Sequence, residues 1–194
     1  MSAAAKTNID APATEFVGRA RELRVLREQF REGRRLITIL GTAGTGKTRL
    51  AREVGLRSVD TFREGGVWFC DLSQAEEADD VAVEVAAVLG SDVEGTASLE
   101  ERRDRIGAAL ASRGRILVVF DNFEQISDTS DQLVRPWLDA TDETVFLVTS
   151  RERLRLGDEF CFDLDPLPAE EAVELFEARA GMAATDFEVT DELY

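Results

Sequence analysis

Short runs of apolar residues alternate along the chain with longer segments whose apolar positions recur every three or four residues. The apolar runs predict strands at 36–40, 67–72, 115–120, 144–149 and 160–164. These runs lack the strict alternation of a half-exposed strand, which favours a parallel sheet covered on both faces. Because helical segments separate the strands, the pattern indicates an α/β fold.

Helical spacing predicts the elements between these strands. The expected helices are 19–33, 47–59, a stretch around 81–89, 98–112, 131–140 and 168–180. Pro136 predicts a kink or a restart within the fifth of these helices. In the last helix, Val173, Phe176 and Ala180 are expected to form one apolar face.

Composition describes an acidic chain whose size suits one domain. Its 194 residues include 23 Lys plus Arg and 39 Asp plus Glu, a net charge of −16 at pH 7. This charge argues against a general binder of nucleic acids or membrane surfaces, because phosphate groups would be repelled. Histidine is absent, which excludes histidine catalysis and histidine metal ligands. Without a long apolar span or a signal-peptide core, we expect a cytoplasmic protein.

Two cysteines, Cys70 and Cys161, each lie inside a hydrophobic run. Neither has a partner at the spacing of metal ligands. We interpret both as reduced core thiols of a cytosolic protein. A buried disulfide between them stays open as the alternative.

The strongest motif follows the first predicted strand. Gly41, Gly46, Lys47 and Thr48 fit the P-loop pattern G-x-x-x-x-G-K-[ST] between a strand and a helix. Glycines let the loop turn sharply and aim backbone N–H groups at phosphates, beside the positive end of the helix dipole. Lys47 can reach the β- and γ-phosphates, and the Thr48 hydroxyl can ligate Mg²⁺. An empty glycine-rich turn is the alternative. The residues expected around the nucleotide phosphates are Thr42, Ala43, Gly44, Thr45, Gly46, Lys47, Thr48 and Arg49.

A carboxylate for the metal is predicted at the end of the third strand. Asp121 follows an apolar run, and ligands of open parallel sheets bind beyond this edge. We expect Asp121 to position Mg²⁺ together with Thr48; a turn-capping aspartate is the alternative. Asn122 stands where many hydrolysing P-loop ATPases have a second acid. Glu124, two positions further, either orients the attacking water or is a solvated loop acid.

An arginine is expected to face the same edge of the sheet. Arg151 follows the fourth strand, and its bidentate fork suits a γ-phosphate. A solvated surface arginine in the charge-rich stretch RERLR is the alternative. The candidate catalytic residues are therefore Lys47, Asp121, Glu124 and Arg151.

Five segments in chain order together resemble a known family. They read FVGRARELRVL, GTAGTGKTRLA, ILVVFDNFEQI, FLVTSRERLRL and LDPLPAEEAVELFEARA. The set is similar to the nucleotide-binding domain of the signal-transduction ATPases with numerous domains (STAND), an AAA+-related family that includes the NB-ARC domains. It is most similar to bacterial predicted ATPases joined to regulator or kinase domains. The similarity spans residues 16–193.

The resemblance implies a three-layer α/β/α P-loop NTPase with a five-stranded parallel sheet of order 5-1-4-3-2. It implies that Phe16, Val17, Gly18 and Arg19 lie against adenine and ribose; a hydrophobic staple before a helix is the alternative. ATP or ADP and Mg²⁺ are the implied cofactors. The implied partners are other domains of a larger regulatory protein, or a second copy in a nucleotide-dependent oligomer. No nucleic acid within this segment and no membrane is expected.

Three parts of the chain are expected from this resemblance. Residues 1–14 would be a flexible lead-in and 15–182 the P-loop domain. Residues 183–194 would begin a connection to a helical lid that relatives carry and this chain lacks, because no G-L-P motif occurs. We interpret the chain as an excised fragment, with a naturally short protein as the alternative.

The predicted function is a nucleotide-binding switch module that binds ADP or ATP with Mg²⁺ and hydrolyses ATP slowly. The lid that is missing and Asn122 leave the hydrolysis itself open. The alternatives are a stand-alone AAA+-type ATPase, a small-molecule kinase and a non-hydrolysing nucleotide-binding scaffold.

Overall fold

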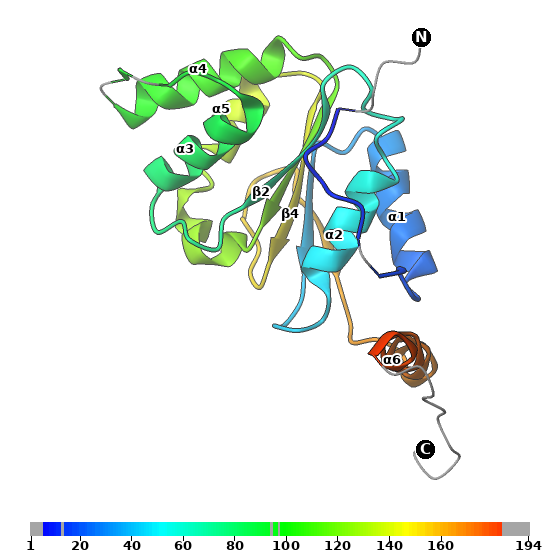
Figure 1. Cartoon of the computed structure of the whole chain (residues 1–194). Helices are drawn as coiled ribbons and strands as arrows, with labels where there is room; N and C mark the ends of the chain where they lie inside the picture. Colours follow the sequence, from blue (N-terminus) through cyan, green and yellow to red (C-terminus); the bar gives the residue numbers. More distant parts are fainter. Residues whose placement is uncertain (1–5, 13, 94, 97, 184–194) are drawn as a thin grey trace.

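A five-stranded sheet forms the centre of the computed structural model (Figure 1). The described residues are 6–12, 14–93, 95, 96 and 98–183. Each strand pairs in parallel with its neighbour. The spatial order confirms the predicted 5-1-4-3-2 topology, read from the other edge. In that order the strands are β2 (Gly66–Asp71), β3 (Ile116–Asp121), β4 (Thr144–Ser150), β1 (Leu36–Leu40) and β5 (Phe160–Asp163).

Helices cover both faces of this sheet, which confirms the predicted three-layer arrangement (Figure 1). One face carries α1 (Ala20–Arg31) and α2 (Lys47–Leu56). The other carries α3 (Ala78–Leu89), α4 (Leu99–Ala111) and α5 (Val134–Asp139). All residues of β1, β3 and β4 are buried, as the continuous apolar runs predicted.

Aromatic side chains fill both apolar layers. On the α1–α2 side, the rings of Phe30 and Phe62 meet edge to face, with centroids 5.4 Å apart. On the other side, Phe120 stacks on Phe146 at 5.3 Å, and Trp137 lies beside both rings. Ring pairs of this kind stabilise a core beyond the area that they bury. The rigid sheet therefore holds its strand ends in fixed positions.

The last helix, α6 (Ala169–Ala183), stands apart from the sandwich (Figure 1). The sequence predicted an apolar face formed by Val173, Phe176 and Ala180. In the structure Phe176 is 54% exposed, so this face is not packed against the core. The reason is the position of α6, which lies beyond the end of the sheet.

Two local predictions after β3 need correction. A 3-10 helix, η1 (Phe123–Thr129), was not expected, and it follows β3 directly. The helix around Pro136 begins at Val134 rather than at 131, so the proline neither kinks nor restarts it. Proline is tolerated in a first helical turn because the N–H groups there have no intrahelical partner.

The segment 6–9 lies against the edge strand β2, although it falls within the lead-in expected at 1–14. Thr7 forms a parallel bridge with Val67, and Ile9 is only 6% exposed. The Asn8 side chain donates to the Phe69 carbonyl at 2.8 Å and accepts from the Phe69 N–H at 2.7 Å. The packed part of the chain therefore begins before residue 15. The connection expected at 183–194 lies outside the described residues, apart from Ala183.

The cysteines lie on opposite edges of the sheet, Cys70 in β2 and Cys161 in β5. This separation excludes the disulfide within one chain that the sequence left open, and both thiols are free. Cys70 is buried, whereas Cys161 is only half-buried and so is not a full core residue. Burial raises the pKa of both thiols, that of Cys161 to about 11. Neither thiol is therefore ionised or reactive near neutral pH.

Candidate functional site

The glycine-rich loop joins the end of β1 to the start of α2. Gly44 and Gly46 have φ angles of 83° and 91°, in the left-handed region where other residues are strained. No atom lies within 4 Å of the position that a Cβ would take at either glycine. Backbone conformation rather than crowding therefore requires these glycines. The loop leaves open space in front of the N-terminus of α2, where backbone N–H groups have no intrahelical acceptor.

Lys47 lies over this loop and is only 9% exposed. Its Nζ donates to the carbonyl oxygens of Gly41 at 2.8 Å and Thr42 at 3.1 Å. Thr45 contributes a further bond, from its hydroxyl to the same Thr42 carbonyl at 2.9 Å. The ammonium group is thus held at the mouth of the loop by two neutral acceptors, which an anion would replace with a stronger, charge-assisted partner.

Asp121, at the C-terminal end of β3, is the most buried carboxylate of the site, with 2% exposure. Its Oδ1 accepts two hydroxyl protons, from Thr48 at 2.9 Å and from Thr149 at 2.5 Å. Its Oδ2 accepts from the Asn122 side-chain amide at 3.2 Å. Three elements, α2, β3 and β4, therefore meet at one carboxylate, as expected where the ends of parallel strands share an edge.

Burial raises the pKa of Asp121, because removal from water disfavours the charged form. The Thr149 and Thr48 hydroxyls oppose this shift, and the nearby negative charge of Asp71 adds to it. A divalent cation would offset the cost of keeping this buried carboxylate ionised. A hydroxyl and a carboxylate are the oxygen ligands that Mg²⁺ prefers, completed in many proteins by substrate phosphates. The residues at this point therefore fit Mg²⁺, although no three acidic, cysteine or histidine side chains cluster in the described part of the chain.

The turn after β3 depends on an unusual backbone at Asn122, whose φ angle is 64°. Asparagine tolerates this left-handed conformation better than most residues. The Asn122 N–H donates to the Thr149 hydroxyl at 3.1 Å, so β4 also fixes the turn. The turn brings Glu124 back toward the end of the sheet.

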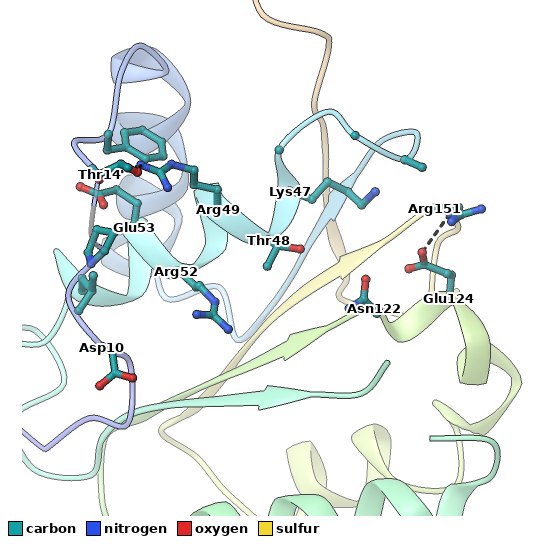
Figure 2. Close-up of a pocket in the computed structure, with 16 residues that line it drawn as sticks. Asp10, Thr14, Lys47, Thr48, Arg49, Arg52, Glu53, Asn122, Glu124 and Arg151 are labelled. Atoms are coloured by element: carbon teal, nitrogen blue, oxygen red, sulfur yellow. Dashed lines mark hydrogen bonds and ion pairs between the residues drawn. The ribbon is translucent and has the colours of Figure 1, made fainter. Parts of the chain in front are cut away.

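Glu124 and Arg151 form an ion pair across the site, with Arg151 Nε 3.0 Å from Glu124 Oε1 (Figure 2). The arginine side chain is 60% exposed and the glutamate only 15%. The second glutamate oxygen, Oε2, is buried and has no hydrogen-bond partner among the described residues. The structure thus joins two residues that the sequence assigned to separate tasks.

A cavity of about 680 Å³ opens in front of the glycine-rich loop, a size typical of small-molecule sites. Part of the predicted set lines it and part lies outside it. The predicted residues on its wall are Phe16, Ala43, Gly44, Gly46, Lys47, Thr48, Arg49, Glu124 and Arg151. The predicted residues that are not on its wall are Val17, Gly18, Arg19, Thr42, Thr45 and Asp121.

Arg19 connects parts of the fold instead of facing the cavity. It is 5% exposed, and its guanidinium donates to the carbonyls of Thr45 at 3.2 Å and Asp165 at 2.7 Å. Its backbone N–H donates to Glu171 Oε2 at 3.0 Å, so α6 caps the N-terminus of α1. Arg19 therefore links the glycine-rich loop to the connection between β5 and α6.

Arg49 uses part of its hydrogen-bonding capacity to bind the N-terminal segment. Its guanidinium donates to both Thr14 oxygens and to the Glu15 carbonyl, at 2.7 to 2.8 Å. It also lies over the Phe16 ring, 5.9 Å from the centroid. These contacts hold residues 14–16 against α2 and place Phe16 on the cavity wall.

Sequence reasoning missed one cation of the cavity, Arg52 (Figure 2). It lies one helical turn after Thr48, so the i, i+4 spacing on α2 could have indicated it. Its guanidinium stacks on Phe69, 4.2 Å from the ring centroid, and its charge opposes the raised pKa of Asp121. The other lining residues that were not predicted are Asp10, Pro12, Thr14, Glu53, Leu56 and Asn122.

Comparison with protein families matches residues 30–156 to the family described as AAA domain. An uncharacterized protein of Mycobacterium tuberculosis is 32% identical over 178 residues, covering 91% of this chain and 44% of that protein. Another protein of this species, provisionally named an HTH-type transcriptional regulator, is 35% identical over 159 residues, covering 81% of this chain and 17% of that protein. The chain therefore spans less than half the length of these curated relatives.

Solved structures with the same fold include the ORC1 protein of Aeropyrum pernix, determined in complex with DNA. It is 24% identical, with a TM-score of 0.66 over 87% of this chain and 50% of that chain. A signal-transduction ATPase with numerous domains and a tetratricopeptide repeat sensor, from Pyrococcus horikoshii, is 21% identical, with a TM-score of 0.58 over 94% of this chain and 28% of that chain. Among the described residues, no helix is both long and apolar enough to cross a bilayer. The family match covers more than half of the sequence, and the chain belongs to the AAA domain family.

Proposed function

We propose that this domain is a cytoplasmic switch module that binds ADP or ATP with Mg²⁺ and hydrolyses ATP slowly. The observation that carries the proposal is the hydrogen bond between Thr48 and Asp121, beside Lys47 and an open glycine-rich loop. A P-loop alone indicates phosphate binding. The added contact between its hydroxyl residue and a strand-end carboxylate supports a site for nucleotide-bound Mg²⁺, because both are oxygen ligands of the kind that this ion takes.

Each residue has a separate task in this proposal. Lys47 and the N–H groups at the start of α2 bind phosphate oxygens, while Thr48 and Asp121 hold the metal, Asp121 through a water molecule. When bound, Mg²⁺ neutralises phosphate charge and fixes the position of the terminal phosphate. Arg151 recognises the γ-phosphate, and Glu124 accepts a hydrogen bond from the attacking water once Arg151 releases its Oε1.

The switch assignment rests on the STAND resemblance and on the names of two similar proteins. One relative is provisionally named an HTH-type transcriptional regulator, and the matched region makes up only 17% of it. A solved neighbour belongs to the STAND proteins. We therefore propose that the domain controls other parts of a larger regulatory protein, or its own self-association, according to the nucleotide that it holds.

Calorimetric titration of the chain with ADP and with ATP, each with Mg²⁺, tests the binding. Replacement of Lys47 by alanine should weaken binding by about tenfold to a hundredfold, since it removes a charge-assisted contact. The chain has two lysines, so Lys6→Ala is the matched control and should bind normally. Unchanged affinity in Lys47→Ala would refute the assignment of the loop.

A turnover assay then separates the switch from its alternatives. We expect phosphate release well below the median enzyme rate of about 10 per second. Rapid turnover would instead favour a stand-alone ATPase. Tight binding with no turnover would favour a non-hydrolysing scaffold.

A further inference from the structure

Positive charge is concentrated on α1 and the residues that flank it, although the whole chain carries a net charge of −16. Residues 19–35 contain seven arginines and three glutamates, a local surplus of four positive charges. The remainder of the chain is correspondingly more acidic. Such charge separation favours contact between the basic surface of one molecule and an acidic surface of another.

A groove of about 340 Å³ gives this basic surface a definite shape. Arg24, Arg27 and Arg31 line it from α1, and Arg57 lines it from the residue after α2. Arg24 and Arg27 form no ion pair with any described residue. Arg31 pairs with the exposed Glu28 of its own helix, a contact that water weakens. Arg57 pairs with Glu53 at 2.6 Å, so the unneutralised positive charge of the groove comes from Arg24 and Arg27.

An acidic surface with matching spacing lies on α6. Glu170, Glu174 and Glu177 are exposed and, at intervals of four and three residues, lie on one face of the helix. No described residue pairs with them. A different side of α6 faces the same copy: Glu171 accepts from the Arg19 N–H, and Leu175 lines a small cavity together with Thr14 and Glu15. The acidic face is therefore free to meet a partner.

We propose that α6 of one copy of this chain docks antiparallel in the α1 groove of a second copy. The arginines are spaced by three and four residues, and the glutamates have this spacing when α6 is read in reverse. Within one copy the contact between Glu171 and the Arg19 N–H holds the start of α6 at the start of α1, away from the groove's far end. In the proposed register the pairs are Arg24 with Glu177, Arg27 with Glu174, and Arg31 with Glu170.

This contact joins two different surfaces, so a pair of copies keeps a free groove on one copy and a free α6 on the other. Head-to-tail contacts of this type build rings or open chains. The inference goes beyond nucleotide binding, because none of the six pairing residues lines the nucleotide cavity.

Sedimentation velocity of the full chain over a concentration series tests the self-association. At about 50 mM NaCl the average mass should rise with protein concentration, and at about 500 mM it should return to the monomer, because salt screens exposed ion pairs. A chain that stays monomeric at low salt would refute the proposal. If it instead binds another acidic protein through the groove, the choice of a second copy is wrong.

Charge reversal identifies the two surfaces. Arg27→Glu and Glu174→Arg should each weaken association at least tenfold. An equimolar mixture should regain it, because Glu174 of one variant meets Arg27 of the other and the reversed pair is also of opposite charge. The double variant, with both reversals in one chain, should regain association. Arg21→Glu and Glu143→Arg make the same charge changes at exposed positions outside both surfaces and should associate like the wild type. Association that survives the single reversals would overturn the assigned register.

Nucleotide titration of the same variants separates this inference from the proposed function. Both single reversals should bind ADP like the wild type, because their side chains lie outside the nucleotide cavity. Loss of self-association with intact ADP binding supports the docking surface. Failure of the wild type to bind nucleotide would refute the proposed function and leave the association result unaffected.

Discussion

Arg151 holds Glu124 through a 3.0 Å ion pair between its Nε and the glutamate Oε1 at the mouth of the cavity. The pair joins the end of β4 to the helix after β3. A γ-phosphate would compete with Glu124 for the arginine, because both are anions that accept from the same guanidinium. Recognition of the phosphate and release of the glutamate are thus one event in the proposed switch.

Replacement of Arg151 by alanine should therefore weaken ATP binding while leaving ADP binding within about twofold. A charge-assisted hydrogen bond contributes about 1.5–3 kcal/mol, which predicts a loss of about tenfold to a hundredfold for ATP. The ion pair itself is too exposed to stabilise the fold strongly, so the melting temperature should change little. Calorimetric titration with each nucleotide measures the ratio of ATP affinity to ADP affinity in the variant and in the wild type. Arg153→Ala removes an exposed arginine two positions further along the chain and is the control.

Glu124→Gln provides the reciprocal prediction. The neutral amide holds Arg151 more weakly because it lacks the charge of the carboxylate, so ATP affinity should stay equal or rise a few-fold. Phosphate release should fall by about a hundredfold, the usual contribution of a positioned base. A single-turnover assay at saturating ATP makes the measurement. Turnover equal to that of the wild type would show that Glu124 is a solvated loop acid.

The raised pKa of Asp121 predicts a pH dependence of stability in the absence of Mg²⁺. Between the ordinary carboxyl pKa, about 4, and the raised pKa, the folded chain binds more protons than the unfolded chain. The free energy of unfolding attributable to Asp121 therefore falls as the pH rises through this window. Asp121→Asn should lack this fall and melt at a higher temperature than the wild type near pH 7.

Thermal melts of the two proteins from pH 4 to pH 8 test this prediction. The difference between their melting temperatures should grow with pH and then level off. Mg²⁺ with ADP should close it by stabilising only the wild type, and the exposed Asp142→Asn variant should follow the wild type throughout. A difference in melting temperature that stays constant at all pH values would show that ionisation of the buried Asp121 does not destabilise the fold.

Local chemistry made part of this molecule predictable. β1 and β3 are apolar because both faces of each strand are covered, and the left-handed backbone of the loop at position 46 requires glycine. The partner of Arg19 could not be found in this way, because its acceptor at Asp165 lies 146 positions away and is a carbonyl oxygen. Backbone acceptors carry no side-chain signature. The Glu124–Arg151 pair was missed for a related reason: each residue suited a ligand equally well.

Thr149 is predicted to stabilise the fold through its hydroxyl rather than through its size. It is fully buried, donates to Asp121 at 2.5 Å and accepts from the Asn122 N–H at 3.1 Å. Thr149→Val keeps the shape but leaves the N–H of a strained turn without a partner. The expected loss is about 1–3 kcal/mol of unfolding free energy. Denaturant unfolding measures it, and Thr149→Ser, which keeps the hydroxyl, should recover most of the loss.

Gly18 and Glu171 should show strong coupling in a double-mutant cycle. Gly18 has a φ angle of 73°, and a Cβ there would overlap the Glu171 carboxylate. Gly18→Ala should therefore cost about 1–2 kcal/mol for its backbone and a further amount for displacing Glu171 from the Arg19 N–H. In a Glu171→Ala background the same substitution should cost little beyond the backbone part, because only the Cβ of residue 171 remains nearby, at 3.3 Å. The difference, about 1 kcal/mol, measures how firmly α6 is held to α1. If the two substitutions are additive, Glu171 does not hold α6 in solution, and the link from the glycine-rich loop through Arg19 ends before that helix.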